Sequence, residues 1–307
     1  MGSPLVVVAG PTGSGKSHLA LALATRFQGE IVNCDSLQIY RALDIGTAKT
    51  PVADRGDIPH HLLDFLEPTE IFNAGGYAKL ARPVLQDIAA RGRLPILAGG
   101  TGFYLRALLD GLNDGPVRDD GLRSRLLARK GSLHRLLVRF DPITAQRIHP
   151  NDRNKTLRAL EICLLARRPA SDLFRAERQP LQGFRVLKLG LNPPRRLLHQ
   201  RIEARAHRMF ESGLMEEVRQ LLAQGVPPGA KAFESIGYKE CLQLLDGHLN
   251  LAQAIELTTI ATRQYAKRQI TWFRREPDIH WIDEFGDAPL AVQRAFALVA
   301  EFTHTSP

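Results

Sequence analysis

The sequence predicts an α/β protein in which a parallel sheet is flanked by helices and is interrupted by an all-helical insertion domain. Three observations lead to this fold. A compact apolar run at residues 5–9 precedes a glycine-rich loop and a helical pattern. Apolar runs and helical patterns then alternate as far as residue 112. From residue 115 the helical runs are short and rich in arginine, with no strand pattern until residue 184. Alternation of this kind is typical of parallel sheets.

Residues 10–17 match the G-x-x-x-x-G-K-S pattern of loops that cradle linked phosphates. The glycines let successive backbone N–H groups turn toward phosphate oxygens, and a helix predicted at residues 16–27 adds its positive end. Lys16 is expected to reach the outer phosphate, and Ser17 to ligate Mg²⁺. The core is therefore P-loop NTPase-like, although the pattern does not say whether the phosphates belong to a nucleotide. The predicted phosphate-binding residues are Gly10, Pro11, Thr12, Gly13, Ser14, Gly15, Lys16 and Ser17.

Asp35 directly follows a second predicted strand at residues 30–34. Ligands bind at the carboxyl edge of a parallel sheet, so Asp35 is expected to face the phosphate loop. An Asp in this place is typical of a carboxylate that orients magnesium in P-loop enzymes. It could equally accept a proton as a general base, or only cap a turn. Position alone leaves these interpretations open.

The next predicted elements are a glycine-containing loop at 44–49, a short strand at 60–64, a helix at 73–91 and a strand at 94–98. His60 and His61 are interpreted as structural, because no third metal ligand is spaced to join them. The strand at 94–98 runs into Gly99, Gly100, Thr101 and Gly102, where many ATPases place a carboxylate. This edge offers close backbone approach and a neutral hydroxyl instead. A short helix at 103–112 follows.

The insertion domain is predicted at residues 116–189, between core segments 1–115 and 190–307. Its helices are expected at 121–130, 133–140, 143–148 and 155–166. Residues 118–208 carry 22 Lys and Arg against 8 Asp and Glu, a net charge of +14, whereas the whole chain carries +9. An excess confined to one segment of a phosphate-binding protein favours a polyanionic partner, such as nucleic acid, over an ordinary solvated surface.

The last third of the chain is predicted to be mainly helical, with runs at 195–211, 214–224 and 251–275. On the last of these, Arg263, Lys267 and Arg274 share one face, and Tyr265 and Trp272 fall on the roughly opposite, apolar side. Two interpretations remain: a solvated amphipathic helix, or a helix that contacts a phosphate backbone.

Composition bounds the class of protein. A chain of 307 residues that is 44% hydrophobic can build a sizeable core, in about two domains. It has neither an apolar run of about 18 residues nor a basic leader, so we expect no membrane span, no signal peptide and a cytoplasmic location. Cys34, Cys163 and Cys241 lie far apart and are interpreted as reduced thiols without a structural metal. We expect a monomer, because no extra apolar stripe needs a partner.

Taken in order, these segments resemble the bacterial tRNA dimethylallyltransferases, also called tRNA isopentenyltransferases or IPP transferases. The resemblance runs from the phosphate loop to about Trp281, nearly the whole chain. A phosphate loop alone is shared by many families, but this series in this order is highly specific. The segments that carry it are 10–17, 35–40, 44–49, 60–64, 99–104, 151–161, 235–239 and 262–272.

The resemblance implies that the loop at 10–17 holds the diphosphate of dimethylallyl diphosphate, with Mg²⁺ on Ser17. Lys16 and Arg219 would stabilise the departing diphosphate. Asp35 would act as general base on the exocyclic amine of the adenine 3′-adjacent to the anticodon, in tRNAs that read codons beginning with U. Thr101 would lie between the base and the diphosphate. The implied tRNA-binding residues are Asp35, Ser36, Leu37, Gln38, Thr101, Arg123, Asn154, Lys155, Thr156, Leu157 and Arg158.

Lys155 departs from the family pattern, in which many relatives carry Arg at this position. A lysine cannot make the bidentate contact of an arginine, so this implied RNA contact is the weakest of the set. The helical insertion would cover the anticodon stem-loop, which agrees with the basic charge of residues 118–208.

Three other functions compete with this interpretation. The phosphate loop and Asp35 alone would permit a nucleotide or small-molecule kinase, but the glycine-rich end of the strand at 94–98 argues against one. A non-catalytic RNA-binding switch would not need Asp35 and Thr101 together. An adenylate prenyltransferase would use the same chemistry on a free nucleotide, and the +14 segment argues against so small an acceptor.

Overall fold

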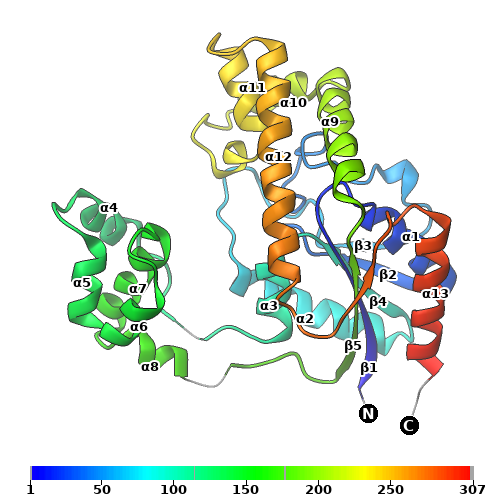
Figure 1. The fold of residues 1–307 in the computed structure, drawn as a ribbon, viewed down its shortest axis with the longest axis horizontal. Helices are drawn as coiled ribbons and strands as arrows, with labels where there is room; N and C mark the ends of the chain where they lie inside the picture. The colour runs from blue at the N-terminus through cyan, green and yellow to red at the C-terminus, as the bar shows by residue number, and fades with distance from the viewer. Residues whose placement is uncertain (1, 114, 176–177, 305–307) are drawn as a thin grey trace. The chain divides into compact units, whose positions relative to one another are not determined.

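The structure, a computed structural model, describes residues 2–113, 115–175 and 178–304. It contains a six-stranded sheet with the order β3-β2-β4-β1-β5-β6, and every strand pair in this sheet is parallel (Figure 1). The strands are β1 Ser3–Ala9, β2 Gly29–Asn33, β3 His60–His61, β4 Leu94–Gly99, β5 Phe184–Leu191 and β6 Ile279–Ile282. The predicted α/β fold with a parallel sheet is confirmed.

Helices cover both faces of this sheet. α1 (Lys16–Phe27) and α13 (Pro289–His304) pack on one face and close the main apolar core, and α2 (Ala74–Ala90) and α3 (Gly102–Leu109) lie on the other (Figure 1). The central strand β1 is buried from Leu5 to Ala9, as expected for a strand covered on both sides. A short 3₁₀ helix, η1 (Val52–Asp54), lies in the connection between β2 and β3.

A group of helices after β5 extends beyond the carboxyl edge of the sheet (Figure 1). It comprises α9 (Arg195–Glu211), α10 (Leu214–Ala223), the 3₁₀ helix η2 (Lys231–Glu234), α11 (Tyr238–Leu245) and the long α12 (Leu251–Phe273). The end of α9, α10, η2 and α11 share a second apolar core with residues 39–43, which includes Leu43, Val218 and Phe233. The residues after β2 are thereby fixed to the helices near the chain's other end.

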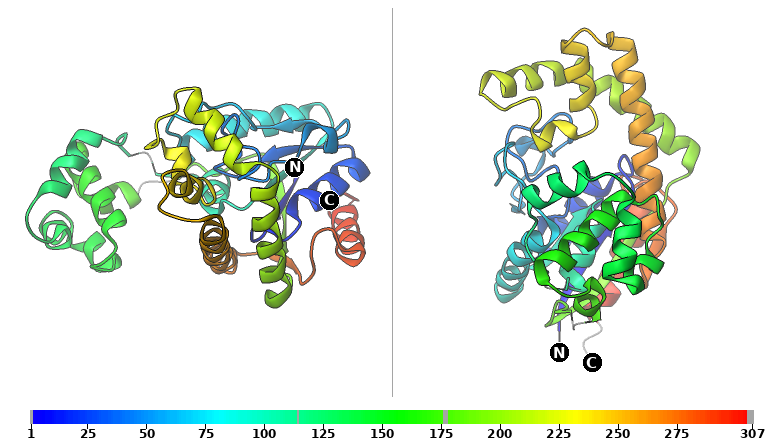
Figure 2. Two further views of the ribbon diagram at one scale, coloured as in Figure 1. Left: turned by 90° about the horizontal axis from the view of Figure 1, so that it is seen from above. Right: turned by 90° about the vertical axis from the view of Figure 1, so that its left-hand side faces the viewer.

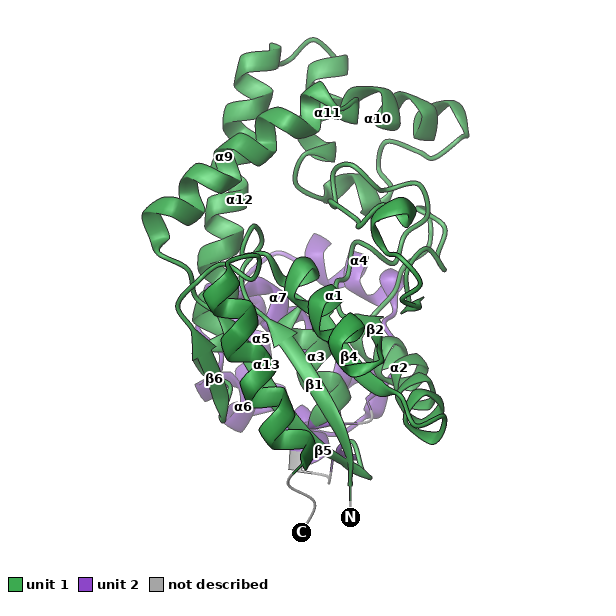
Figure 3. Ribbon diagram, turned by 90° about the vertical axis from the view of Figure 1, so that its right-hand side faces the viewer, with its two compact units in different colours: residues 1–109, 181–307 green, residues 110–180 purple. Residues whose placement is uncertain are grey.

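The chain divides into two compact units, shown in Figure 3. The core unit comprises residues 1–109 and 181–307, and the helical unit comprises residues 110–180. The predicted boundary at residue 189 differs from the observed one, because residues 184–190 pair with β1 along its whole length and so belong to the sheet. The backbone N–H of Leu181 donates to the carbonyl of Leu109 at 2.8 Å, so the two ends of the insertion meet in the core unit.

The helical unit contains no strand among its described residues, 110–113, 115–175 and 178–180. Its helices are α4 (Asp120–Ala128), α5 (Leu133–Phe140), α6 (Pro142–Arg147), α7 (Arg153–Ala166) and α8 (Ala170–Arg175), gathered into one bundle (Figure 2). Asp119, Ser132, Asp141 and Asp152 each cap the helix that follows by accepting a backbone N–H. The all-helical insertion predicted from the sequence is confirmed, with its own core around Leu137.

Across the described part of the chain, no helix combines the length and the apolar character that crossing a membrane requires. The three cysteines are buried and unpaired.

Candidate active site

A cavity of about 840 Å³ lies in the core unit, lined by the phosphate loop, the ends of β2 and β4, and helices α9 and α12. The structure brings many of the predicted site residues together around it. Those that line it are Thr12, Gly13, Gly15, Lys16, Ser17, Asp35, Ser36, Leu37, Gln38 and Thr101. Gly10, Pro11 and Ser14 belong to the same loop but are buried.

The phosphate loop is held by segments from the far end of the chain. The buried side chain of Gln269 on α12 accepts the N–H of Thr12 at 2.8 Å and donates to the carbonyl of Gly100 at 2.9 Å. The N–H of Gly286 donates to the carbonyl of Ser14 at 2.8 Å. Pro11 has no N–H, that of Thr12 is engaged, and that of Ser14 donates to the Pro11 carbonyl at 3.3 Å. The amides left to cradle an anion therefore lie mainly at residues 15–17, in the second half of the loop.

Two cations meet at this loop. Lys16 Nζ donates to the carbonyl of Pro11 at 2.7 Å, and Arg205 Nη1 on α9 donates to Thr12 Oγ1 at 3.3 Å. Burial lowers the pKa of Lys16 to about 8; the Asp35 carboxylate opposes this shift and the Arg205 guanidinium adds to it. Burial also lowers the pKa of Arg205. Two close, partly dehydrated cations favour the binding of a compact polyanion between them.

Asp35 and Thr101 lie on neighbouring loops that are fastened to each other. Thr101 Oγ1 accepts the N–H of Ser36 at 3.0 Å, and Asp35 Oδ1 accepts that of Leu37 at 2.9 Å. A Cβ on Gly99 would lie 2.1 Å from the carbonyl oxygen of Cys34, so only glycine permits this close approach of β4 to the end of β2. The sequence alone correctly places Asp35 beside the phosphate loop.

Several residues of the cavity are absent from the sequence prediction. Arg201, Arg205 and Arg208 line it from α9, and their spacing of four and three places them on one helical face. That periodicity marks one face of the helix in the sequence, but it does not say that this face is internal. Tyr265 lines the cavity too, although its position on α12 suggests an apolar role. Burial raises the pKa of Tyr265, and the nearby Asp35 carboxylate raises it further.

The structure does not bring Arg219 to the cavity. Arg219 lies on α10, where its half-exposed side chain pairs with Glu216 at 3.4 Å. It is not among the residues that line the cavity. The arginine that the structure does place at the phosphate loop is Arg205 on α9. The two helices are consecutive and both carry arginines, so the sequence does not say which of them faces the loop.

The predicted RNA-binding residues of the helical unit fall into three groups. Asn154 and Lys155 are exposed at the start of α7, whereas Thr156 and Leu157 are buried in the unit. Arg123 and Arg158 both bond to the fully buried carboxylate of Glu161, at 3.0 and 2.7 Å. Burial alone would raise the pKa of Glu161, but the hydrogen bonds from these two arginines lower it. Their guanidinium groups therefore hold the unit together.

The described residues could hold Mg²⁺ at this loop only together with a bound anion. Within residues 2–113, 115–175 and 178–304, no three His, Cys, Asp or Glu side chains are grouped so that they could hold a metal. Ser17 is exposed at the start of α1 and lines the cavity. One hydroxyl together with phosphate oxygens and water is a donor set that suits Mg²⁺.

The sequence is similar to one known protein family over most of its length. The profile of the IPP transferase family matches residues 38–276. A tRNA dimethylallyltransferase of Solibacter usitatus is 59% identical over 303 residues, which cover 97% of this chain and 99% of that protein. One from Koribacter versatilis is 52% identical with the same coverage.

Solved structures agree with these sequence relatives. The full-length tRNA isopentenylpyrophosphate transferase of Bacillus halodurans is similar with a TM-score of 0.73 and 36% identity, over 97% of this chain and 96% of that one. A eukaryotic dimethylallyltransferase acting on tRNA is similar with a TM-score of 0.85 and 30% identity, over 99% of this chain and 80% of that one.

Proposed function

The chain belongs to the IPP transferase family, the tRNA dimethylallyltransferases, and we propose on that basis how its cavity transfers a prenyl group to tRNA. The donor is dimethylallyl diphosphate, and the acceptor is the exocyclic amine of the adenine 3′-adjacent to the anticodon in tRNAs that read codons beginning with U. The observation that carries the proposal is the meeting, in one cavity, of a cationic phosphate loop with Asp35 and Thr101.

The diphosphate lies on the second half of the phosphate loop. Lys16 and Arg205 face it together with the free loop amides, and all three stabilise the negative charge that grows as the carbon–oxygen bond breaks. Ser17 and the diphosphate oxygens would hold Mg²⁺, which when bound neutralises part of that charge. No nucleotide is hydrolysed, because the loop serves only the departure of diphosphate.

Asp35 accepts the proton of the attacking amine. The nitrogen forms its bond to the allylic carbon, the electron pair of the carbon–oxygen bond leaves with diphosphate, and one amine proton passes to a carboxylate oxygen of Asp35. The hydrogen bond from Ser36 N–H to Thr101 Oγ1 holds the loop that carries Asp35 against the loop that carries Thr101. The amine thus attacks on the side of Asp35, and the diphosphate leaves on the side of Lys16.

The tRNA reaches the cavity with its acceptor base unstacked. An adenine in an anticodon loop is extracted more easily than one in a duplex, and its edge can then be read by Gln38 and its neighbours. The exposed Asn154 and Lys155 contact the RNA backbone. We place the enzyme in the cytoplasm and infer a monomer, because the sequence has no extra apolar stripe that needs a partner.

The test mixes the protein, Mg²⁺ and unmodified tRNA with labelled dimethylallyl diphosphate or, in parallel, labelled ATP. The expected result is prenyl label in the RNA, equimolar release of diphosphate and no ATP turnover. Phosphate release from ATP without prenylation would refute the proposal.

A further inference from the structure

Loop 44–49 borders the cavity through Gly46, Thr47 and Ala48, yet the chemistry above does not use it. The loop instead forms hydrogen bonds with the side chain of Gln38. The side-chain Nε2 of Gln38 donates to the carbonyls of Thr47 at 3.2 Å and Ala48 at 3.4 Å. A carbonyl oxygen only accepts, so the NH₂ group must face the loop. What Gln38 can still offer to a ligand is its acceptor oxygen, Oε1.

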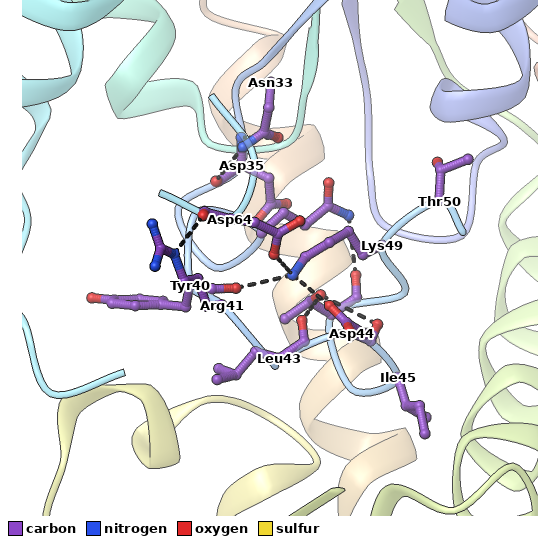
Figure 4. Close-up of polar contacts among 12 residues, drawn as sticks. Asn33, Asp35, Tyr40, Arg41, Leu43, Asp44, Ile45, Lys49, Thr50 and Asp64 are labelled. Atoms are coloured by element: carbon purple, nitrogen blue, oxygen red, sulfur yellow. Dashed lines mark hydrogen bonds and ion pairs between the residues drawn. The ribbon is translucent and has the colours of Figure 1, made fainter. Parts of the chain in front are cut away.

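Lys49 fixes one end of this loop. Its side chain is 3% exposed, and Nζ bonds to the carbonyl of Tyr40 at 2.9 Å, to Asp44 Oδ1 at 2.5 Å and to the carboxylate of Asp64 (Figure 4). These three partners match the three donors of an ammonium group. A buried charge is tolerated only when it is fully partnered, and full partnering fixes the geometry around it.

Glu217 on α10 fixes the other end. Its carboxylate accepts the N–H groups of Ile45 at 2.8 Å and Asp44 at 3.0 Å, and the hydroxyl of Tyr238 at 2.5 Å. A Cβ at Gly46 would lie 2.2 Å from the Tyr238 ring, so the loop packs against this ring without room for a side chain. Three segments that carry the family resemblance, 35–40, 44–49 and 235–239, are therefore joined in one arrangement.

The backbone around Lys49 is strained in the same region. Four non-glycine residues adopt φ values between 48° and 58°, the left-handed region that such residues rarely occupy. They are Ala42, Ala48, Leu62 and Asp64. Conformations of this kind persist where the surroundings determine them, and they concentrate at functional sites.

We propose that Lys49 is a positioning residue that selects the acceptor base: it fixes loop 44–49 so that the loop carbonyls keep the Gln38 amide oxygen toward the acceptor. This inference rests on the proposed function. An amide oxygen accepts an N–H of an exocyclic amine and repels the carbonyl that hypoxanthine carries at the same place. The amine has two N–H groups, of which Asp35 takes one and Gln38 accepts the other.

The test compares two anticodon stem-loop RNAs, one with adenine and one with hypoxanthine at the acceptor position. The first is a substrate and gives KM; the second cannot be prenylated and gives an inhibition constant. Lys49→Met frees the loop and lets the Gln38 amide turn over. The ratio of the inhibition constant of the hypoxanthine RNA to the KM of the adenine RNA is then expected to fall about tenfold. KM for dimethylallyl diphosphate should stay within about twofold.

Three further variants separate an effect on positioning from an effect on stability. Glu217→Gln loosens the other end of the loop and should lower the same ratio, which keeps the proposal testable if Lys49→Met does not fold. Arg91→Met breaks the pair of Arg91 with the buried Glu30, at the opposite end of β2 from Asp35. It should lower the melting temperature without changing the ratio. Lys49→Arg keeps the charge, so its ratio should stay closer to the wild-type value than the ratio of Lys49→Met.

The proposal is overturned if folded, active Lys49→Met and Glu217→Gln both reject hypoxanthine RNA as well as the wild type does. It is also overturned if Arg91→Met lowers the ratio as much as they do. A wild-type protein that transfers no prenyl group would instead refute the proposed function, which is a distinguishable result.

Discussion

The cations at the phosphate loop and the cations around Glu161 in the helical unit are used differently. At the phosphate loop, Lys16 and Arg205 bond to neutral oxygens, the carbonyl of Pro11 and the hydroxyl of Thr12. In the helical unit, Arg123 and Arg158 bond to the buried carboxylate of Glu161. A cation held by neutral groups keeps its charge for a ligand, whereas a cation held by a buried carboxylate maintains the fold. Net charge alone therefore does not identify which basic residues bind an anion.

The largest expected effect concerns the carboxylate that faces the loop cations. Asp35→Asn should lower the rate of prenyl transfer about 10²–10⁴-fold, because the amide cannot accept the amine proton. Affinity for the tRNA, measured by filter binding, should survive. Loss of RNA binding together with activity would refute the general-base role.

Lys16→Met should lower kcat/KM for dimethylallyl diphosphate about 10²–10³-fold, because it removes a donor to the leaving group. Its melting temperature should not fall, because a partly buried charge is removed. Lys188→Met is the matched control, since Lys188 also donates to a proline carbonyl, that of Pro277 at 3.3 Å, but does not line the cavity. Equal losses of activity in the two variants would contradict the assignment.

Glu161→Gln should destabilise the helical unit by about 2–3 kcal/mol, because Arg123 and Arg158 lose their charged partner. Hydrogen exchange should show the loss in α4 and α7 and leave the sheet unaffected. Asp152→Asn, which breaks the more exposed pair with Lys155 at 2.8 Å, should cost much less stability. If Glu161→Gln and Asp152→Asn destabilised the unit equally, the buried carboxylate of Glu161 would have no special role in holding the fold together.

Inhibition by inorganic pyrophosphate should weaken about tenfold per pH unit above about pH 8, the pKa of Lys16 in the free protein. Inhibition weakens as the pH rises because the anion binds to the protonated form of Lys16, and in the free protein Lys16 loses its proton above that pH. Between about pH 8 and 10.5 the unfolded chain binds the extra proton, so this residue's contribution to folding stability rises with pH. Lys16→Met should remove both dependences.

The smallest effect is expected at the exposed Lys155. Lys155→Ala should weaken tRNA binding about two- to threefold and reduce the slope of log affinity against log salt by about one. No change in the slope would indicate that Asp152 keeps this lysine from the RNA.

The parts of the site that the sequence predicted are those encoded by short continuous patterns. The loop at 10–17 and Asp35 each follow an apolar strand, and a parallel sheet brings the ends of its strands to one edge. Arg205 could not be selected, because arginines occur all along 195–208 and only the packing of α9 on α12 decides which face is internal. Glu161 resembles any surface carboxylate until the fold buries it.

The hydrogen bond between Leu181 and Leu109 has a consequence for the chain as a polymer. With its ends already in contact, the helical unit is a closed loop of about 70 residues attached at one point. Closing such a loop costs only about 2–3 kcal/mol more than closing a turn of four residues, since loop entropy grows with the logarithm of length. The sheet can therefore carry helical units of very different lengths at this point with little change in its own stability.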